Sequence, residues 1–161
     1  MQHQGAGVTI RPARRDEVPA IVALLADDPL GRERETAGDP LPDAYWRAFD
    51  EMAAQTGNLL FVAERDGAVP GDIIGCLQLT IIPGLSRRGM TRAQIEAVRV
   101  GARARGSGVG EQMVRHAIEV ARAAKCGLVQ LTSDVSRTDA HRFYERLGFV
   151  ASHVGFKLAL D

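Results

Sequence analysis

The sequence is organised around one stretch in which a β-branched run passes into a glycine-rich turn and then into a long amphipathic pattern. Residues 95–100 are typical of a strand, and Arg105-Gly106-Ser107-Gly108-Val109-Gly110 carries three glycines at alternate positions. From Glu111 to Lys125, apolar residues recur at helical spacing. A strand that enters a helix through such a turn directs free N–H groups and the positive helix end to one place. The stretch therefore predicts a phosphate site.

Two familiar nucleotide motifs do not fit this turn. A dinucleotide fingerprint needs G-x-G-x-x-G after an early strand, whereas these glycines read G-x-G-x-G and follow the fourth expected strand. A P-loop needs Gly-Lys-Ser/Thr, which is absent from the turn. What fits is R-x-x-G-x-G at the start of a helix, although glycine also serves any tight turn.

The remaining patterns predict one α+β domain spanning residues 1–161, in the order β, α, α, three strands, then αβαβ. Expected strands cover residues 8–11, 59–63, 73–82, 95–100 and 128–132, and expected helices cover residues 16–27, 43–55, 111–125 and 138–147. Leu30–Pro42 is expected to be a loop or a broken helix. Gly127 sits where a helix-ending glycine belongs. Phe149-Val150 and Gly155–Leu160 predict a last hairpin, or a strand with a bulge at Gly155.

Composition excludes several classes of protein. Twenty basic and twenty acidic residues cancel, which argues against nucleic-acid binding through bulk charge. Met1–Gly7 lacks the order of a signal peptide, and no apolar run reaches the roughly 18 residues of a membrane span, so we expect a cytoplasmic location. The four histidines show no metal-ligand spacing, which predicts no metal site. Cys76 and Cys126 are expected as buried free thiols, with a disulfide or a nucleophile as alternatives.

A second motif lies about 35 residues after the glycines. The run Asp139-Ala140-His141-Arg142-Phe143-Tyr144-Glu145-Arg146-Leu147-Gly148-Phe149 contains Ala-x-x-Phe-Tyr-x-x-x-Gly-Phe. Together with the glycine turn, it closely resembles the GNAT superfamily of acyl-CoA-dependent N-acetyltransferases. The resemblance covers nearly the whole chain, because the order of strands and helices also matches.

The resemblance implies a three-layer α/β/α fold with a mixed, mostly antiparallel sheet of 6–7 strands that splays open between the fourth and fifth. It places acetyl-CoA in that gap, with the pantetheine arm facing the backbone of Val98 and Val100. The backbone of Arg105, Gly106, Ser107, Gly108, Val109 and Gly110 then holds the pyrophosphate. Glycines allow the close approach and the helix start favours the anion. Arg105 adds a cation to the phosphate or to the turn, while Arg103 is expected as an exposed loop residue.

Tyr144 matches the general acid that the family uses to protonate the departing CoA thiolate. Tyrosine suits this role because its ordinary pKa of about 10 keeps it protonated at neutral pH. The alternative is a core aromatic beside Phe143. Arg137 stands where the family commonly has Asn, and it is expected to reach the CoA phosphates or the approach to the helix instead.

The general base is less defined. A primary amine must be neutral to attack, so a group must take its proton. Glu96 lies on the strand where many relatives place a carboxylate, and Glu33 and Glu35 lie in the region that usually walls the acceptor site. The alternatives are that Glu96 is a paired strand residue and that Glu33 and Glu35 form a solvated face beside Arg32 and Arg34. His141 and His153 are expected at the surface or in packing contacts.

The predicted function is transfer of an acetyl group from acetyl-CoA to a primary amine of a small molecule or peptide, by direct attack in a ternary complex, with Val98 N–H stabilising the oxyanion. The alternatives are a non-catalytic acyl-CoA sensor and a nucleic-acid-binding regulator. Acidic residues between Asp27 and Glu51 favour a cationic amine, or are ordinary solvated side chains. Arg87, Arg88 and Arg92 lie in a loop that is solvated or that favours an anionic substrate or the CoA 3′-phosphate. A homodimer is common in the family.

Overall fold

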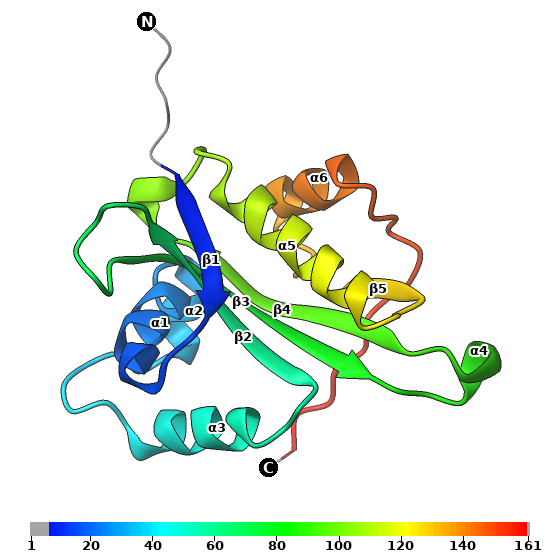
Figure 1. Cartoon of the computed structure of the whole chain (residues 1–161), viewed down its shortest axis with the longest axis horizontal. Coiled ribbons are helices and arrows are strands. Elements are labelled where there is room, and N and C mark those ends of the chain that lie inside the picture. The colour runs from blue at the N-terminus through cyan, green and yellow to red at the C-terminus, as the bar shows by residue number, and fades with distance from the viewer. Residues whose placement is uncertain (1–6, 161) are drawn as a thin grey trace, which may run out of the picture.

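The computed structural model describes residues 7–160 and is built on one mixed sheet in which the strands follow chain order (Figure 1). Its strands are β1 (Val8–Pro12), β2 (Asn58–Arg65), β3 (Ile73–Ile82), β4 (Arg92–Val100) and β5 (Leu128–Leu131). The first four are antiparallel neighbours, and β5 lies parallel to β4. A mixed, mostly antiparallel sheet was expected, and the structure confirms it.

Helices cover both faces of this sheet (Figure 1). One face carries α5 (Val109–Ala123) and α6 (Thr138–Arg146), and the other carries α1 (Val18–Leu25), α2 (Pro29–Arg34) and α3 (Asp43–Ala53). The short elements are η1 (Arg15–Glu17), α4 (Ser86–Gly89) and η2 (Ala102–Ala104). The expected broken helix before Pro42 is therefore α2 followed by a loop.

Strand β3 supplies residues to both cores because successive side chains point to opposite faces. Leu77 and Leu79 are fully buried under α5, whereas Cys76 packs with Ile21 of α1 on the other face. The apolar stripe of α5 includes Met113, which is almost completely buried against the sheet. Burial on both faces holds the middle strands rigidly beneath the helices.

Helix α5 ends differently from the expectation. The residue in left-handed conformation is Lys125, with φ 59°, and not Gly127. The N–H of Cys126 bonds back to the Ala121 carbonyl at 3.0 Å, which closes the last turn. Position 127 requires glycine for a different reason, because a larger residue would clash: its Cβ would lie 2.7 Å from Met90 Cγ.

The sheet splays between β4 and β5, as predicted. Arg92–Ile95 pair with Leu128–Leu131, and no pairing continues toward Val100. The second half of β4 therefore has a free edge in the described part of the chain. Backbone groups on that edge remain available to a ligand.

The expected sheet of 6–7 strands is wrong, because the described residues form five. The predicted last hairpin is missing: residues 149–160 adopt no regular structure. The prediction fails because a strand needs a partner, and none of the described strands pairs with this segment. The expectation for Met1–Gly7 concerns residues that, apart from Gly7, lie outside the described range. No helix among the described residues is long and apolar enough to cross a membrane.

Candidate active site

The free edge of β4 begins at a bulge. Ala97 has φ 53°, and the pairing with β3 shifts so that Ala97 and Val98 together oppose Leu77. A bulge of this kind bends a strand and re-aims the side chains that follow. As a result, Val98 and Val100 pack on the α5 side, and Arg99 points to the face that carries α1 and α2.

The carbonyls of Val98 and Val100 face the gap, since both accept hydrogen bonds from arginine side chains rather than from β3. Arg99 Nη1 donates to the Val98 carbonyl at 2.9 Å, and Arg105 Nε donates to the Val100 carbonyl at 3.2 Å. The N–H and C=O of one strand residue point to the same side. The backbone of both valines thus faces the gap, and its contact with the pantetheine arm stays a prediction.

The glycine turn forms the inner end of the gap. Gly106 and Gly108 have φ 75° and 84°, a left-handed conformation that suits glycine. The first backbone hydrogen bond of helix α5 runs from the Gln112 N–H to the Gly108 carbonyl, at 3.1 Å. The N–H groups of Val109, Gly110 and Glu111 are therefore directed out of the helix start, together with its positive dipole end.

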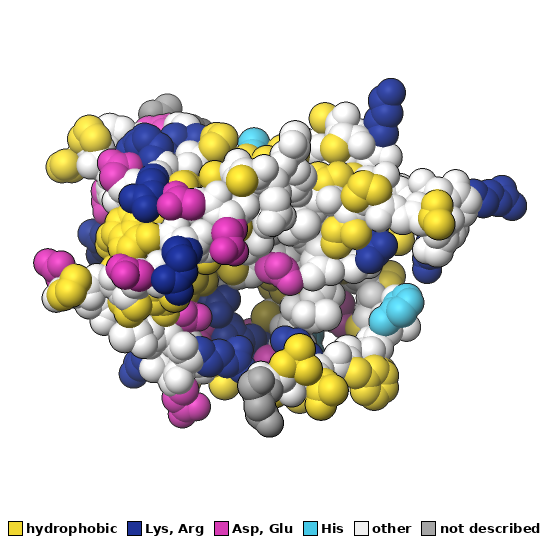
Figure 2. All heavy atoms as spheres, turned by 90° about the horizontal axis from the view of Figure 1, so that it is seen from below, with side chains coloured by type: hydrophobic (Ala, Val, Ile, Leu, Met, Phe, Trp, Pro, Cys, Tyr) yellow, Lys and Arg dark blue, Asp and Glu magenta, His cyan; other side chains and the backbone are white. Residues whose placement is uncertain are grey.

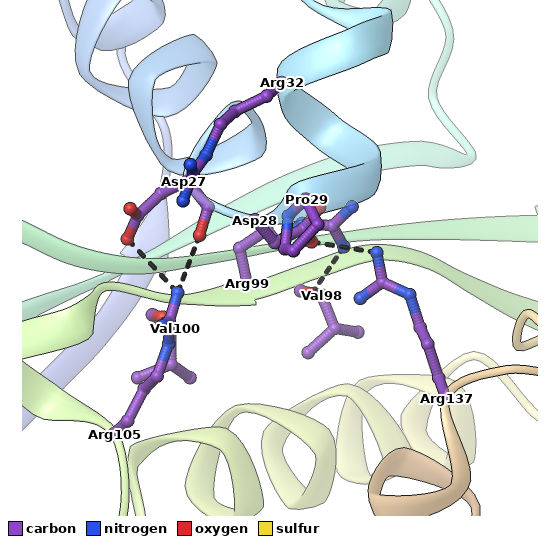
Figure 3. Close-up of a pocket in the computed structure, with 9 residues that line it drawn as sticks. All are labelled: Asp27, Asp28, Pro29, Arg32, Val98, Arg99, Val100, Arg105 and Arg137. Atoms are coloured by element: carbon purple, nitrogen blue, oxygen red, sulfur yellow. Dashed lines mark hydrogen bonds and ion pairs between the residues drawn. The ribbon is translucent and has the colours of Figure 1, made fainter.

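Arg105 and Arg137 reach across the gap from opposite ends to the turn between α1 and α2 (Figure 3). Arg105 Nη2 donates to the Asp27 carbonyl at 2.7 Å and lies 3.2 Å from its carboxylate. Arg137, at the start of α6, donates to Asp28 Oδ2 at 2.8 Å. Arg105 thus contacts the α1–α2 turn, which was not among its expected partners, and Arg137 contacts the same turn through Asp28.

Asp28 joins three elements. Its Oδ1 accepts from Gly31 N–H at 2.5 Å and caps α2, while its Oδ2 meets Arg137 and lies 3.1 Å from Arg99 Nε. That buried Nε has no hydrogen bond of good geometry within residues 7–160. Burial alone would raise the pKa of Asp28, but the Gly31 N–H and the guanidinium groups of Arg137 and Arg99 hold it below its usual range. Asp28 is therefore a carboxylate at neutral pH.

These groups surround a cavity of about 340 Å³ that opens between β4 and the α1–α2 turn (Figure 3). Four arginines and two aspartates contribute to its wall, which leaves an excess of positive charge. The lining residues are Asp27, Asp28, Pro29, Arg32, Val98, Arg99, Val100, Arg105 and Arg137. The cavity is thus suited to an anionic group.

Tyr144 is half-buried on α6, where its ring packs edge-to-face on Phe143 and Phe149. Burial raises the pKa of its phenol, and the nearby positive charges of Arg99 and Arg137 oppose this only in part. The phenol is therefore protonated at neutral pH and lies within the field of the cavity arginines. Phe143 packs against the main core, as expected.

Glu96 lies on β4 immediately before the bulge, exposed, and outside the cavity lining. Its carboxylate accepts from Gln94 Nε2 at 2.7 Å, and Gln94 in turn accepts from Gln130 at 2.9 Å. Because the bulge at Ala97 interrupts the alternation of side chains, Glu96 shares the face of Arg99 and not that of α5. Its role as a base stays a prediction.

Other candidates lie apart from the cavity. Glu35 binds the Tyr45 hydroxyl, and Arg87 and Arg88 lie at the tip between β3 and β4, far from α1 and α2 (Figure 1). Cys76 is fully buried, and burial raises its pKa to about 12, which makes it a poor nucleophile. Cys126 is a free thiol as well. Within residues 7–160, no group of three His, Cys, Asp or Glu residues could hold a metal ion.

Residues 20–149 match the Acetyltransferase (GNAT) family. The chain belongs to this family. GNAT proteins transfer acetyl groups to amines, and acetyl-CoA is their donor. The chain is thus an N-acetyltransferase by family, as the two motifs indicated.

Two relatives and one solved structure are similar to this GNAT chain. A glucosamine 6-phosphate N-acetyltransferase of Oryza sativa subsp. japonica is 33% identical over 71% of this chain and 68% of its own. An aminoalkylphosphonate N-acetyltransferase of Salmonella typhimurium is 45% identical over 56 residues, which span 35% of this chain and only 36% of the relative. A transcriptional regulator from Bacillus halodurans C-125 has a TM-score of 0.90 and 47% identity, over 96% of this chain and 100% of that one.

Sequence reasoning missed five residues of this GNAT cavity, namely Asp27, Asp28, Pro29, Arg32 and Arg99. Arg99 was read only as part of a strand, and Arg32 and Asp28 only as part of a charged region. The bulge at Ala97 turns Arg99 toward Asp28, and nothing in Glu96-Ala97-Val98 signals a bulge, since the left-handed residue is not glycine. Asp28 before Pro29 is the one signal available, as a typical helix-capping pair.

Proposed function

We propose that residues 1–161 form one domain that transfers the acetyl group of acetyl-CoA to the primary amine of a small molecule carrying a phosphate or phosphonate. This proposal rests on one observation: two features of the structure meet at the free edge of β4. The free edge of β4 ends at the glycine turn, and the same edge opens onto a cavity with an excess of arginines. The first feature suits the donor, and the second suits an anionic acceptor.

The donor binds along the free edge of β4. The N–H groups of the turn, including Gly106, Ser107, Gly108, Val109 and Gly110, hold the pyrophosphate, where the left-handed glycines and the helix start favour an anion. Arg105 adds a positive charge beside this turn while it fixes the turn to Asp27. The backbone of Val98 and Val100 pairs with the pantetheine arm. Supporting this assignment, β5 leaves that backbone uncovered.

The reaction proceeds by direct attack of the amine nitrogen on the thioester carbonyl carbon. A C–N bond forms, and the negative charge that develops on the carbonyl oxygen is stabilised by the Val98 N–H. The C–S bond then breaks, and Tyr144 gives its proton to the departing sulfur. The proton that the amine loses passes to Glu96 through water, and solvent returns a proton to Tyr144.

The cavity does not favour a cationic substrate once the partners of its two aspartates are considered. Asp27 and Asp28 are both engaged by arginines, and Glu35 is engaged by Tyr45. What remains in the cavity is the excess of guanidinium, the group that best matches phosphate geometry. The two curated relatives are named for substrates that combine an amine with a phosphonate or a phosphate.

The test is an amine panel read by release of CoA thiol. It pairs aminoethylphosphonate with ethanolamine and glucosamine 6-phosphate with glucosamine, and it adds spermidine as a cationic amine. We expect kcat/KM to favour the phosphorylated member of at least one pair by about 10- to 100-fold, since a charge-assisted hydrogen bond contributes roughly 1.5–3 kcal/mol. Arg137→Gln should lower the ratio of kcat/KM between the two members of that pair. Arg87→Gln, at the tip between β3 and β4, should leave this ratio unchanged. A preference for spermidine would overturn the acceptor class.

A regulatory role is the second candidate, because the Bacillus halodurans relative is named a transcriptional regulator. In this case, acetyl-CoA binds in the same gap and no amine in the panel turns over. Tight CoA binding without turnover, together with a salt-sensitive shift of DNA fragments in a gel, would favour this role. Turnover of any amine at an ordinary enzymatic rate would favour the transferase.

A further inference from the structure

The face of the sheet that carries α1 and α2 also holds a row of polar side chains, only one of which takes part in the proposed reaction. Along β3, alternation places Cys76, Gln78 and Thr80 on this face, and Cys76 is fully buried under α1. The strand register then adds side chains from β2, β4 and β5. The polar row consists of Asn58, Gln78, Thr80, Gln94, Glu96 and Gln130.

Hydrogen bonds join members of the polar row into two short chains. Gln130 Nε2 donates to Gln94 Oε1 at 2.9 Å, and Gln94 Nε2 donates to Glu96 Oε1 at 2.7 Å. On β3, Gln78 Nε2 donates to Asn58 Oδ1 at 2.9 Å. A glutamine amide has two N–H groups and an oxygen with two lone pairs, so these bonds leave donors and acceptors for a ligand at every glutamine of the row.

The polar row is accessible from outside. Glu96 is exposed and the other five side chains are half-buried, in contrast to Cys76 farther along the same face. Figure 2 views the molecule from this side and shows an open hollow, with Lys and Arg side chains gathered beside it. A ligand in front of the sheet can therefore reach the amide groups of the row.

The chemistry of the polar row differs from that of a solvated surface of the same chain. The outer face of α5 carries charges in ion pairs, Arg115 with Glu111 and Arg122 with Glu119. In the row, Glu96 is the only charged side chain. An amide both donates and accepts hydrogen bonds, as a hydroxyl group does, so the row matches hydroxyl groups better than it matches an ion.

The spacing along β4 favours a substrate with a long body. Glu96, the proposed base, and Arg99, in the wall of the cavity, lie on the same face and three residues apart. At about 3.3 Å per residue, this separation is roughly 10 Å along the strand. Gln94 precedes Glu96 by two positions, and Gln78 pairs with Glu96 from β3. A two-carbon body between amine and phosphate is short for this distance, and a sugar-sized body fits it better.

We propose that the polar row binds hydroxyl groups of the acceptor, and that the acceptor is a phosphorylated amine with a hydroxyl-bearing body, such as an amino sugar phosphate. This inference rests on the proposed acetyl transfer to a phosphorylated amine and adds which members of that class are preferred. The phosphate lies at the arginines of the cavity, and the hydroxyl groups contact Gln78, Gln94 and Gln130. A site built to hydrogen-bond a substrate rejects an analogue that leaves its polar groups unpaired.

The first test compares glucosamine 6-phosphate with O-phosphoethanolamine by release of CoA thiol. Both carry an amine and a phosphate ester, and only the sugar carries further hydroxyl groups. We expect kcat/KM to be about tenfold higher or more for the sugar. A preference for O-phosphoethanolamine, or equal values, would overturn this inference and leave the proposed function standing. Equal kcat/KM for each phosphorylated amine and its unphosphorylated partner would instead overturn the proposed acceptor class.

The double variant Gln78→Met, Gln130→Met removes two amides and keeps the side-chain length. These two side chains donate to Asn58 and Gln94 and not to Glu96, so the base keeps its partner. The ratio of kcat/KM between the two amines should fall about tenfold, as expected for the loss of two neutral hydrogen bonds. Thr9→Val, on β1 at the other edge of the sheet, is the control and should leave this ratio unchanged.

A binding test examines the polar row without turnover. Glucose 6-phosphate has the hydroxyl groups and the phosphate but no amine, and ethyl phosphate has the phosphate alone. In calorimetry with CoA present, the natural chain should bind glucose 6-phosphate about tenfold more tightly or better, and the double variant should lose this difference while it keeps its Kd for acetyl-CoA. Equal Kd values of the two esters for the natural chain, or a difference that the double variant retains, would show that the row does not bind hydroxyl groups.

Discussion

A substitution at Gly108 separates the backbone strain of the glycine turn from its role in binding. Gly108 has φ 84°, and an added Cβ would meet no atom within 4 Å. Gly67, in the turn between β2 and β3, is a matched control, since its φ is 74° and an added Cβ there also meets no atom within 4 Å. The two glycines thus share their conformation and their open surroundings, and they differ in their distance from the gap.

The same stability loss is therefore expected for Gly108→Ala and Gly67→Ala. A left-handed conformation costs a non-glycine residue about 1–2 kcal/mol. In a chain of this size, each kcal/mol lowers Tm by about 2–4 °C, so both variants should unfold about 2–8 °C below the natural protein. Asp tolerates this conformation better than Ala, so Gly108→Asp should be no less stable than Gly108→Ala.

Binding of CoA should distinguish the two positions in isothermal titration calorimetry. Gly67→Ala and Gly67→Asp should keep the natural Kd. Gly108→Ala should weaken Kd about tenfold or more, which corresponds to 1.4 kcal/mol, and Gly108→Asp should abolish binding because its carboxylate faces the pyrophosphate. An unchanged Kd for Gly108→Asp would refute the phosphate site at this turn.

Two further predictions concern the α1–α2 turn. Asp28→Asn should lower stability by about 2 kcal/mol at pH 7, because it retains a helix cap but loses the charge opposite Arg99 and Arg137. The pKa of Asp28 is lowered in the folded state, so its carboxylate stabilises the fold above its ordinary pKa of about 3.9, and this stabilisation is lost as pH falls through the folded-state pKa. Urea unfolding at pH 7 and at pH 3 measures the free energy of unfolding of Asp28→Asn and of the natural protein. The difference between the two proteins should be smaller at pH 3. Gly31→Ala should lower the free energy of unfolding by about 1–3 kcal/mol, because its Cβ would lie 2.0 Å from the Leu25 carbonyl oxygen. Gly38→Ala is the control and should be nearly neutral, because an added Cβ there meets no atom within 4 Å. Equal effects of the two substitutions on Tm would contradict this packing.

The glycine turn and its helix could be predicted because their signals are local. A strand run, alternate glycines and a helical period each depend on neighbouring residues, and α5 begins and ends within two residues of the expected bounds. The second motif placed Tyr144 on a helix for the same reason. The splay between β4 and β5 was expected only through the family resemblance, since no local pattern shows where pairing stops.

The cavity could not be predicted because it depends on contacts between distant residues. Asp28 and Arg137 are 109 positions apart, and their ion pair requires the bulge, the splay and the start of α6 to be in place together. Residues 149–160 show the same limit. Their sequence predicted a last hairpin, but the residues of a segment do not determine which strand edge pairs with it, and none of the described strands does.

The central claim, that Tyr144 is the acid in an acetyl transfer, is tested most directly by kcat of Tyr144→Phe with the best amine of the panel. General-acid catalysis contributes about 10²–10⁴-fold, so kcat should fall by that factor while the Kd for acetyl-CoA stays unchanged. Tyr45→Phe is the matched control, since it removes the only other tyrosine hydroxyl of the chain and should leave kcat within about twofold. A kcat and a pH profile of Tyr144→Phe equal to those of the natural protein would contradict the account.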